Sequence, residues 1–534
     1  TITIPDNITS IGKSAFSRCP NLTSLTFPKH LEAIPDNVAN MSQKLEQVTI
    51  PSSVQSIGEM AFAECSALKN VTIEPGVKTI GQSAFTQTAL EEIVLPDTVT
   101  DLGGYTFQLC KSLKHITLPS KLSKIKPYTF DTCTSLPDIS FPDTVTEIGP
   151  SAFNACQKLG NITLPSACTS IGSNAFSYCR SFTNVTLPNN LTSLGSSAFA
   201  NCSQIESIRI SANLTNIKDG IFADCPKLSS ITVAADNPKY DSRDNCNAII
   251  ETASNTLIMG CQSSTIPKGI TAIGAGAFEG CQNLTKVVLE DTVTTIGDQA
   301  FYNCKNLTDI TIPESVTSIG HGAFRASGIS SLVLPSTLEK VSAYIAAECD
   351  NLKTVVVKDG PNRIEDMAFG DCKNLTSVTL PDSIKEFWVH TFRNCSSLPT
   401  VTLPANLKTL GYGTFEGCES LTDITIPSGI TAIQDTTFMN CKSLKALTLP
   451  AGVTSLGSSA FCLSGIEEIV LPAGITELSP SLFSNCKSLK KLTISSPITS
   501  CGNSALFGCD NLTCIVYQNT TYPSVDAFLA VVEK

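Results

Sequence analysis

The chain of 534 residues has few of the side chains from which catalytic or metal-binding sites are usually built. It contains one Trp, five Met and four His, and charged residues make up only 16% of the sequence. No His lies near a pair of cysteines at zinc spacing, so the sequence predicts no metal site and no cofactor. Nucleophile-elbow, zinc-protease and phosphate-loop motifs are also missing, and we therefore expect no enzymatic activity.

Two further absences limit the partners of this protein. No apolar run approaches the roughly 18 residues that a transmembrane helix requires, so no membrane span is expected in the chain. The formal net charge is -11, and Lys and Arg form no stripe along the sequence. An acidic chain without a basic face is a poor ligand for phosphate backbones, which argues against a nucleic-acid partner.

What the sequence does contain is a repeat. A phenylalanine, usually within an Ala-Phe pair, returns about every 23 residues along nearly the whole chain. Nineteen of the 24 Phe residues occupy this position, and two further units lack it, which gives about 21 repeats. One unit alone cannot bury its apolar side chains, so neighbouring units must stack into a solenoid with one continuous core.

Each unit is expected to hold two short strands and one tight turn. The apolar residues Ile139 and Phe141 alternate with a polar residue and are followed by Pro142, which predicts a strand with one buried face. A second extended piece is expected at residues 145–148. Residues 151–156 are too few for an ordinary helix and are predicted to form a helical or 3₁₀ turn.

The whole pattern reads Leu-x-x-Ile-x-Ile-Pro-x-x-Val-x-x-Ile-Gly-x-x-Ala-Phe-x-x-Cys and resembles the BspA-type leucine-rich repeats of bacterial cell-surface proteins. The resemblance covers residues 1–516. It implies an α/β solenoid, an arc or horseshoe with a parallel β-sheet on its concave face and helical or 3₁₀ turns on the other side. Residues 517–534 lose the pattern and are expected to form a C-terminal cap or tail.

The resemblance also carries a functional expectation. It implies a cell-surface or secreted scaffold, located outside the cell, that binds host or microbial surface proteins or glycans as an adhesin. It provides no catalytic residues, and we expect the chain to be monomeric. A structural spacer or stalk that presents another domain at the cell surface is the alternative that the sequence leaves open.

One segment interrupts the repeat. The interval between Phe222 and Phe278 contains 33 extra residues, and this insertion at 234–266 is expected to fold as a β-hairpin within the solenoid. The amino-acid sequence of this insertion resembles that of an insertion found in bacterial members of the family. Insertions in a repeat array map to one face, so Tyr240 and Arg243 are candidate ligand-binding residues.

The cysteines form a ladder. Fifteen of the 23 Cys lie three residues after a repeat Phe. Adjacent rungs should be about 5 Å apart, but their side chains point the same way, so we expect buried free thiols rather than disulfides. A hairpin that turns at residues 253–254 would set Cys246 against Cys261, and these two form a possible disulfide.

The exposed face of the predicted sheet supplies the remaining candidates. The outward position ten residues after each repeat Phe is mostly Thr, Ser or Val, as strand propensity and cross-strand packing favour. Arg209 is an exception in this column, and the column two residues earlier is more varied. Together they form the predicted contact surface, with the candidate ligand-binding residues His115, Arg209, Lys286, Asp309 and Asp423.

Overall fold

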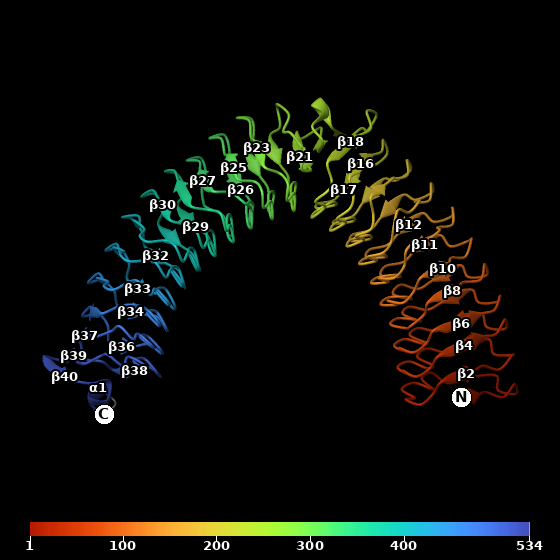
Figure 1. The fold of residues 1–534 in the computed structure, drawn as a ribbon, viewed down its shortest axis with the longest axis horizontal. Coiled ribbons are helices and arrows are strands. Elements are labelled where there is room, and N and C mark those ends of the chain that lie inside the picture. The colour runs from red at the N-terminus through yellow and green to blue at the C-terminus, as the bar shows by residue number, and fades with distance from the viewer. Residues whose placement is uncertain (533–534) are drawn as a thin grey trace. The chain divides into compact units, whose positions relative to one another are not determined.

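A computed structural model of the protein describes residues 1–532 and divides the chain into two compact units. Unit 1 contains residues 1–254 and 258–264, and unit 2 contains residues 255–257 together with the described residues from 265 onward. Each unit is a stack of coils joined by parallel strands, with about 22 coils in the two units together (Figure 1). The predicted parallel-sheet solenoid is thereby confirmed. The predicted arc, with the sheet on its concave face, stays a prediction.

Most coils contribute one strand to a parallel row that we call the main sheet. Paired residues on neighbouring strands lie one repeat apart in the sequence, as Val48 and Val71 do. Outward residues of these strands are exposed and the alternate residues are buried. The main-sheet strands of unit 1 are β1 (Ile2–Thr3), β2 (Ser24–Thr26), β4 (Gln47–Ile50), β6 (Asn70–Ile73), β8 (Glu92–Val94), β10 (His115–Thr117), β14 (Asn184–Val185), β16 (Ser207–Ile210) and β18 (Ser230–Val233); those of unit 2 are β23 (Lys286–Val288), β25 (Asp309–Thr311), β27 (Ser331–Leu334), β28 (Thr354–Val357), β30 (Ser377–Thr379), β35 (Glu468–Leu471), β37 (Lys491–Ile494) and β39 (Cys514–Tyr517).

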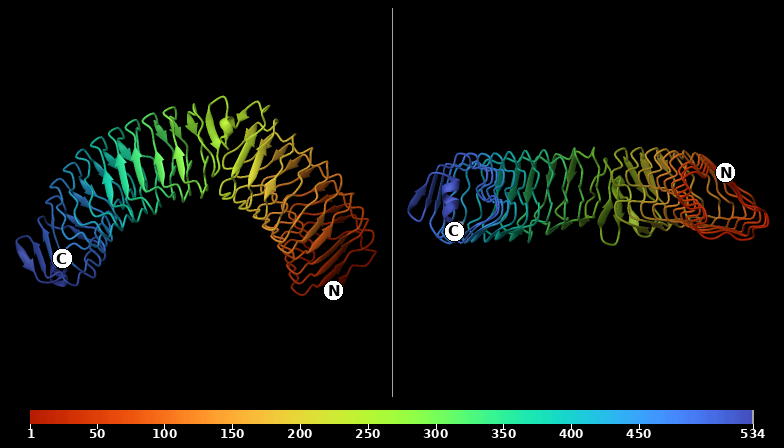
Figure 2. Two further views of the ribbon diagram at one scale, coloured as in Figure 1. Left: turned by 45° about the horizontal axis from the view of Figure 1, so that its top comes forward. Right: turned by 90° about the horizontal axis from the view of Figure 1, so that it is seen from below.

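A second row of two-residue strands runs along each unit, and Figure 2 shows the coils of each unit from two further directions. Glycine follows many of these strands because the coils approach closely there: a Cβ atom on Gly172 would lie 2.4 Å from the backbone nitrogen of Pro150. In unit 1 the strands are β3 (Ala33–Ile34), β5 (Ser56–Ile57), β7 (Thr79–Ile80), β9 (Asp101–Leu102), β11 (Lys124–Ile125), β12 (Glu147–Ile148), β13 (Ser170–Ile171), β15 (Ser193–Leu194) and β17 (Asn216–Ile217); in unit 2 they are β22 (Ala272–Ile273), β24 (Thr295–Ile296), β26 (Ser318–Ile319), β29 (Arg363–Ile364), β31 (Glu386–Phe387), β32 (Thr409–Leu410), β33 (Ala432–Ile433), β34 (Ser455–Leu456), β36 (Glu477–Leu478) and β38 (Ser500–Cys501).

The segment around the repeat Phe is not helical, so the prediction of helical or 3₁₀ turns is wrong. In the coil of Phe153, Ser151 and Ala155 have φ angles of 52° and 56°. A left-handed residue on each side of the Phe interrupts any right-handed helix. The backbone N–H groups of Ser151, Phe153 and Ala155 instead donate to carbonyl oxygens of the next coil, each at 2.8 Å. We call this third inter-coil ladder the turn row.

Helix is confined to two short elements among residues 1–532. One is the 3₁₀ helix η1 (Arg243–Asn245) in the insertion, and the other is α1 (Val525–Val532). Neither has the length or the apolar character needed to cross a bilayer.

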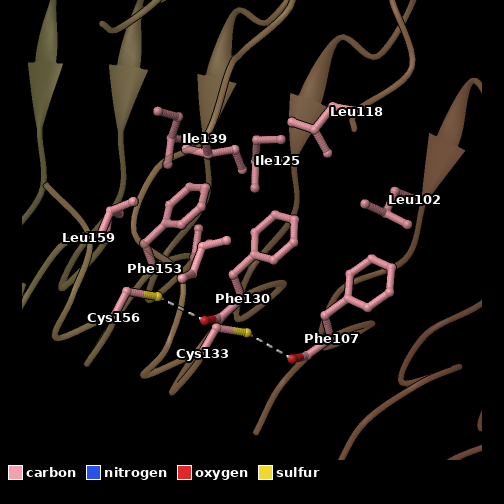
Figure 3. Packing of buried hydrophobic residues seen from close by; sticks show 14 of the residues in the cluster. Leu102, Phe107, Leu118, Ile125, Phe130, Cys133, Ile139, Phe153, Cys156 and Leu159 are labelled. Atoms are coloured by element: carbon pink, nitrogen blue, oxygen red, sulfur yellow. Dashed lines mark hydrogen bonds between the residues drawn. The ribbon is translucent and has the colours of Figure 1, made fainter. Parts of the chain in front are cut away.

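The core of each unit runs along its axis. Repeat phenylalanines stack ring on ring, with centroids of Phe130 and Phe153 5.1 Å apart and those of Phe153 and Phe176 5.3 Å apart. All three are fully buried, and Figure 3 shows Phe130 and Phe153 among Leu and Ile side chains of neighbouring coils. Offset stacking of this kind adds to the free energy gained from apolar burial. This confirms that the coils share one interior within each unit.

The insertion and the C-terminal segment depart from the coil pattern. Within the insertion, β19 (Tyr240–Asp241) pairs antiparallel with β20 (Ile249–Glu251), and β21 (Thr256–Met259) follows. At the other end, β40 (Thr520–Tyr522) pairs antiparallel with β39, and α1 buries Phe528 completely. Residues 533–534 of the predicted cap lie outside the described residues.

Candidate ligand-binding surface

The predicted contact residues lie in separate places on the main sheet. In unit 1, His115 on β10 is the register partner of Glu92 on β8. In unit 2, Lys286 on β23 and Asp309 on β25 are register partners, so two opposite charges stand side by side. Arg209 in unit 1 and Asp423 in unit 2 each lie in a depression whose lining carries no other charge, and Arg209 is the only cation of the two.

Arg209 lies at the centre of the three-stranded sheet β14–β16–β18 in unit 1. Its neighbours Ile208 and Ile210 are 3% and 0% exposed, so the alternation of the strand points Arg209 outward. All four residues of β16 are in register with β18, and Arg209 pairs with Thr232. β18 therefore pairs with Arg209 itself, whereas β14 pairs with the two residues before it, Ser207 and Ile208.

The outward face of this sheet contains an open depression of about 510 Å³. Its lining is polar: Arg209 is the only charged residue, and no acidic residue takes part. Residues 1–532 supply no ion pair or side-chain hydrogen bond to the Arg209 guanidinium, which is left to the solvent. The hydroxyl and amide groups of the lining belong to Asn184, Thr186, Asn189, Ser207, Ser211, Ser230 and Thr232.

Many other cations of the solenoid pair with an acid in a neighbouring coil. Lys114 lies 2.7 Å from Glu91, and Lys490 lies 2.6 Å from Glu467, each pair one repeat apart. Such exposed pairs contribute little to stability, but they neutralise the cation locally. Other exposed cations, such as Lys286 and Arg180, form no ion pair with residues 1–532 either, so the depression distinguishes Arg209 rather than the lack of a partner.

The insertion residues predicted to contact a ligand are used by the fold. Tyr240 is 3% exposed, and its hydroxyl accepts a hydrogen bond from the Ile217 N–H at 3.2 Å and donates to the Thr215 carbonyl at 3.3 Å. Arg243 donates to both carboxylate oxygens of Asp241 at 2.8 and 2.6 Å, which lowers the pKa of that carboxyl. The expectation that Tyr240 faces a ligand is therefore corrected, since its ring belongs to the core.

Cys246 and Cys261 carry free thiols in the structure. The sulfur of Cys261 lies 3.4 Å from the Asn247 carbonyl oxygen, and that of Cys246 lies 3.8 Å from the Ser242 hydroxyl. Burial raises the pKa of the Cys246 thiol. The possible disulfide between them is therefore not formed in this structure.

The turn row carries aromatic side chains that the outward column with Arg209 lacks, and the sequence reasoning missed them. Tyr105 and Tyr128 stack with ring centroids 4.6 Å apart. Their spacing in the sequence could have revealed this pair, since each tyrosine lies two residues before a repeat Phe. In unit 2, the Arg325 guanidinium lies 5.3 Å from the ring centroid of Tyr344 and pairs with Glu348 at 2.6 Å. This cation is already neutralised.

Among residues 1–532, no group of three or more His, Cys, Asp or Glu is arranged to hold a metal ion. The donors of the Arg209 depression, which are hydroxyl, amide and guanidinium groups, suit hydrogen bonding to a polar or anionic ligand.

The chain belongs to the family of the BspA type leucine-rich repeat region. Six matches cover residues 1–114, 100–229, 258–376, 323–445, 362–490 and 408–530, which leaves 230–257 within the insertion region unmatched. The resemblance seen in the sequence is thus confirmed, and the repeat fold is that of a protein-binding scaffold. No curated protein matches the chain.

Solved structures of bacterial leucine-rich repeat proteins are similar to this chain. A leucine-rich repeat protein from Eubacterium ventriosum is 25% identical, over 75% of this chain and 90% of that one, with a TM-score of 0.42. A leucine rich cell surface protein from Faecalibacterium prausnitzii is 24% identical, over 76% and 92%, with a TM-score of 0.45. A protein from Bacteroides ovatus is 21% identical, over 92% and 86%, with a TM-score of 0.35.

Proposed function

We propose that this chain is a secreted or cell-surface adhesin, which uses its main sheet to bind proteins or glycans on host or microbial surfaces. The observation that supports this proposal is the polar depression around the unpaired Arg209 in unit 1. Membership of the BspA-type family supports the choice of a binding scaffold.

The main sheet is suited to binding because its backbone is ordered before a ligand arrives. β14, β16 and β18 are held in register by parallel ladders that bury their inward side chains. A partner then meets side chains on fixed strands and orders little backbone on binding. The same outward column recurs in many coils, so an extended partner can add weak contacts one after another.

A binding assay with one blocked depression tests this proposal. The full chain is immobilised and exposed to purified extracellular matrix proteins and to a glycan array. Ser207→Tyr places a bulky side chain in the depression without changing its charge. Ser377→Tyr is the matched control, because Ser377 is exposed at the equivalent repeat position on β30 of unit 2.

We expect the wild-type chain to bind at least one member of the panel. Ser207→Tyr should weaken that binding by about tenfold or more, which corresponds to about 1.4 kcal/mol, whereas Ser377→Tyr should leave it unchanged. If the wild-type chain binds nothing above background, the adhesin proposal is contradicted. If both variants lose binding equally, the binding site is not at the Arg209 depression.

A further inference from the structure

We infer that the depression around Arg209 binds a sugar that bears a carboxylate, such as a sialic acid or uronic acid unit of a glycan. This inference rests on the proposed function and names the ligand class of the same site.

The charge of the site selects an anionic group. Arg209 presents a planar fork of N–H donors, and a planar carboxylate accepts two parallel hydrogen bonds from such a fork. No acid lines the depression, so nothing within it competes for the guanidinium. The chain as a whole carries a net charge of -11, so its overall electrostatic field repels anions. An anionic ligand must therefore be held by hydrogen-bond donors and the positive charge within the depression.

The rest of the lining suits the hydroxyl groups of a sugar. Asn184, Ser207, Ser230 and Thr232 offer amide and hydroxyl groups that can each donate and accept hydrogen bonds. They come from three successive coils and surround Arg209 along β14, β16 and β18. The depression of about 510 Å³ lies within the size range of small-molecule sites.

The lining, which has one cation and no aromatic side chain, favours the carboxylate sugar over a protein segment and over a neutral sugar. The centres of protein–protein interfaces are usually anchored by Trp, Tyr and Arg in dry pockets, and Arg209 alone does not make such a centre. A neutral sugar has no group that requires a guanidinium. A sulfate ester also carries one negative charge and can accept two hydrogen bonds from a guanidinium, so a sulfated probe belongs in the test.

Isothermal titration of the full chain tests the inference with defined probes. These are 3′-sialyllactose and a hyaluronan tetrasaccharide as carboxylate sugars, lactose as the neutral counterpart, and a fully sulfated disaccharide that lacks a carboxylate. Arg209→Gln removes the charge, and Arg209→Lys keeps the charge but loses the fork. Arg180→Gln is the matched control, because Arg180 is an exposed Arg of the same unit that lies over Tyr178. Thermal unfolding of each variant verifies that it is folded.

We expect the two carboxylate sugars to bind with a dissociation constant of about 1 mM or lower, and lactose to bind at least about tenfold more weakly. Arg209→Gln should lose about tenfold or more in affinity, Arg209→Lys should lose less, and Arg180→Gln should behave as wild type. Added salt should weaken binding to the wild-type chain.

Three results would overturn the inference: equal binding of lactose, affinity unchanged in Arg209→Gln, or binding of the sulfated probe alone. Failure of every sugar to bind would also overturn it. If the protein panel still binds and Ser207→Tyr still weakens that binding, the proposed function survives without the carboxylate sugar. If both assays are negative, both proposals fall.

Discussion

The thiol of Cys133 donates a hydrogen bond to the backbone carbonyl oxygen of Phe107, with sulfur and oxygen 3.2 Å apart. The two residues are 26 positions apart and belong to adjacent coils. Figure 3 shows the next rung, where Cys156 donates to Phe130 at 3.1 Å. The cysteine ladder is therefore a row of buried donors that satisfies carbonyl groups of the turn row, as well as a row of small apolar side chains.

The first prediction concerns the loss of one such donor. Cys133→Ala removes the thiol donor from the Phe107 carbonyl, which still accepts from the Cys110 N–H at 3.1 Å, and we expect the free energy of unfolding to fall by about 0.5–1.5 kcal/mol. Cys133→Ser keeps a donor and should cost less. A serine already replaces the cysteine in one coil, where the Ser42 hydroxyl donates to the Phe16 carbonyl at 2.7 Å across the same interval of 26 residues. Urea denaturation measures both variants, and equal losses would show that the hydrogen bond contributes nothing.

The second prediction concerns pH. Burial raises the pKa of Cys110 to about 11 and those of Cys65 and Cys418 to about 12, from an ordinary value of 9.0. Above pH 9 the unfolded chain loses thiol protons that the folded chain keeps, so the unfolded state binds fewer protons. Stability should therefore be fully present below pH 9 and fall between pH 9 and about 12.

Denaturation midpoints measured between pH 7 and pH 11 test this dependence. Each buried thiol contributes up to about 1.4 kcal/mol per pH unit in that window. A matched chain in which Cys110 is replaced by Ser should show a shallower decline. A midpoint that stays constant up to pH 11 would contradict the burial of the ladder.

The third prediction concerns the close approach of coils at the glycine column. Gly172→Ala would bring a Cβ atom to 2.4 Å from the Pro150 nitrogen, so the coils must separate. We expect a loss of about 1–3 kcal/mol, in the range for overpacked interiors. Gly12→Ala is the control, because it lies in the same column of the first coil and a Cβ atom there meets nothing within 4 Å. Thermal unfolding should show a lower midpoint for Gly172→Ala only.

The fourth prediction concerns the left-handed residues of the turn row. Ala155 has a φ angle of 56°, and the equivalent positions in other coils hold Gly280, Gly417 and Gly508, all with positive φ. Ala155→Gly should therefore be tolerated, whereas Ala155→Val should lower the free energy of unfolding by about 1–2 kcal/mol, because a β-branched side chain resists this conformation. Denaturation of the two variants side by side measures the difference. Similar stabilities would contradict the left-handed geometry.

The sequence predicts the parts of this fold that follow from apolar spacing. Ile139 and Val145 are both buried, as the period-two pattern and the repeat require. The turn row could not be found in the same way, because residues 151–156 look helical when they are read alone. The N–H groups of Ser151, Phe153 and Ala155 donate to carbonyl groups of the next coil, and no local pattern reveals a partner one repeat away.

The candidate site was only partly accessible to sequence reasoning. Arg209 stands out as a charge in a column of Thr, Ser and Val, and the structure places it in a depression. The depression itself needs coordinates, since it depends on how three coils are spaced. Tyr240 shows the opposite error: its hydroxyl bonds to the backbone of Thr215 and Ile217 in the preceding coil, which the sequence does not indicate.

The most direct measurement of the binding account is a crystal structure of the full chain with 3′-sialyllactose. The account predicts that the sugar carboxylate lies within hydrogen-bond distance of the Arg209 guanidinium, with the sugar ring over β14, β16 and β18. An ordered sugar on the turn row, or one whose carboxylate points away from Arg209, would contradict it.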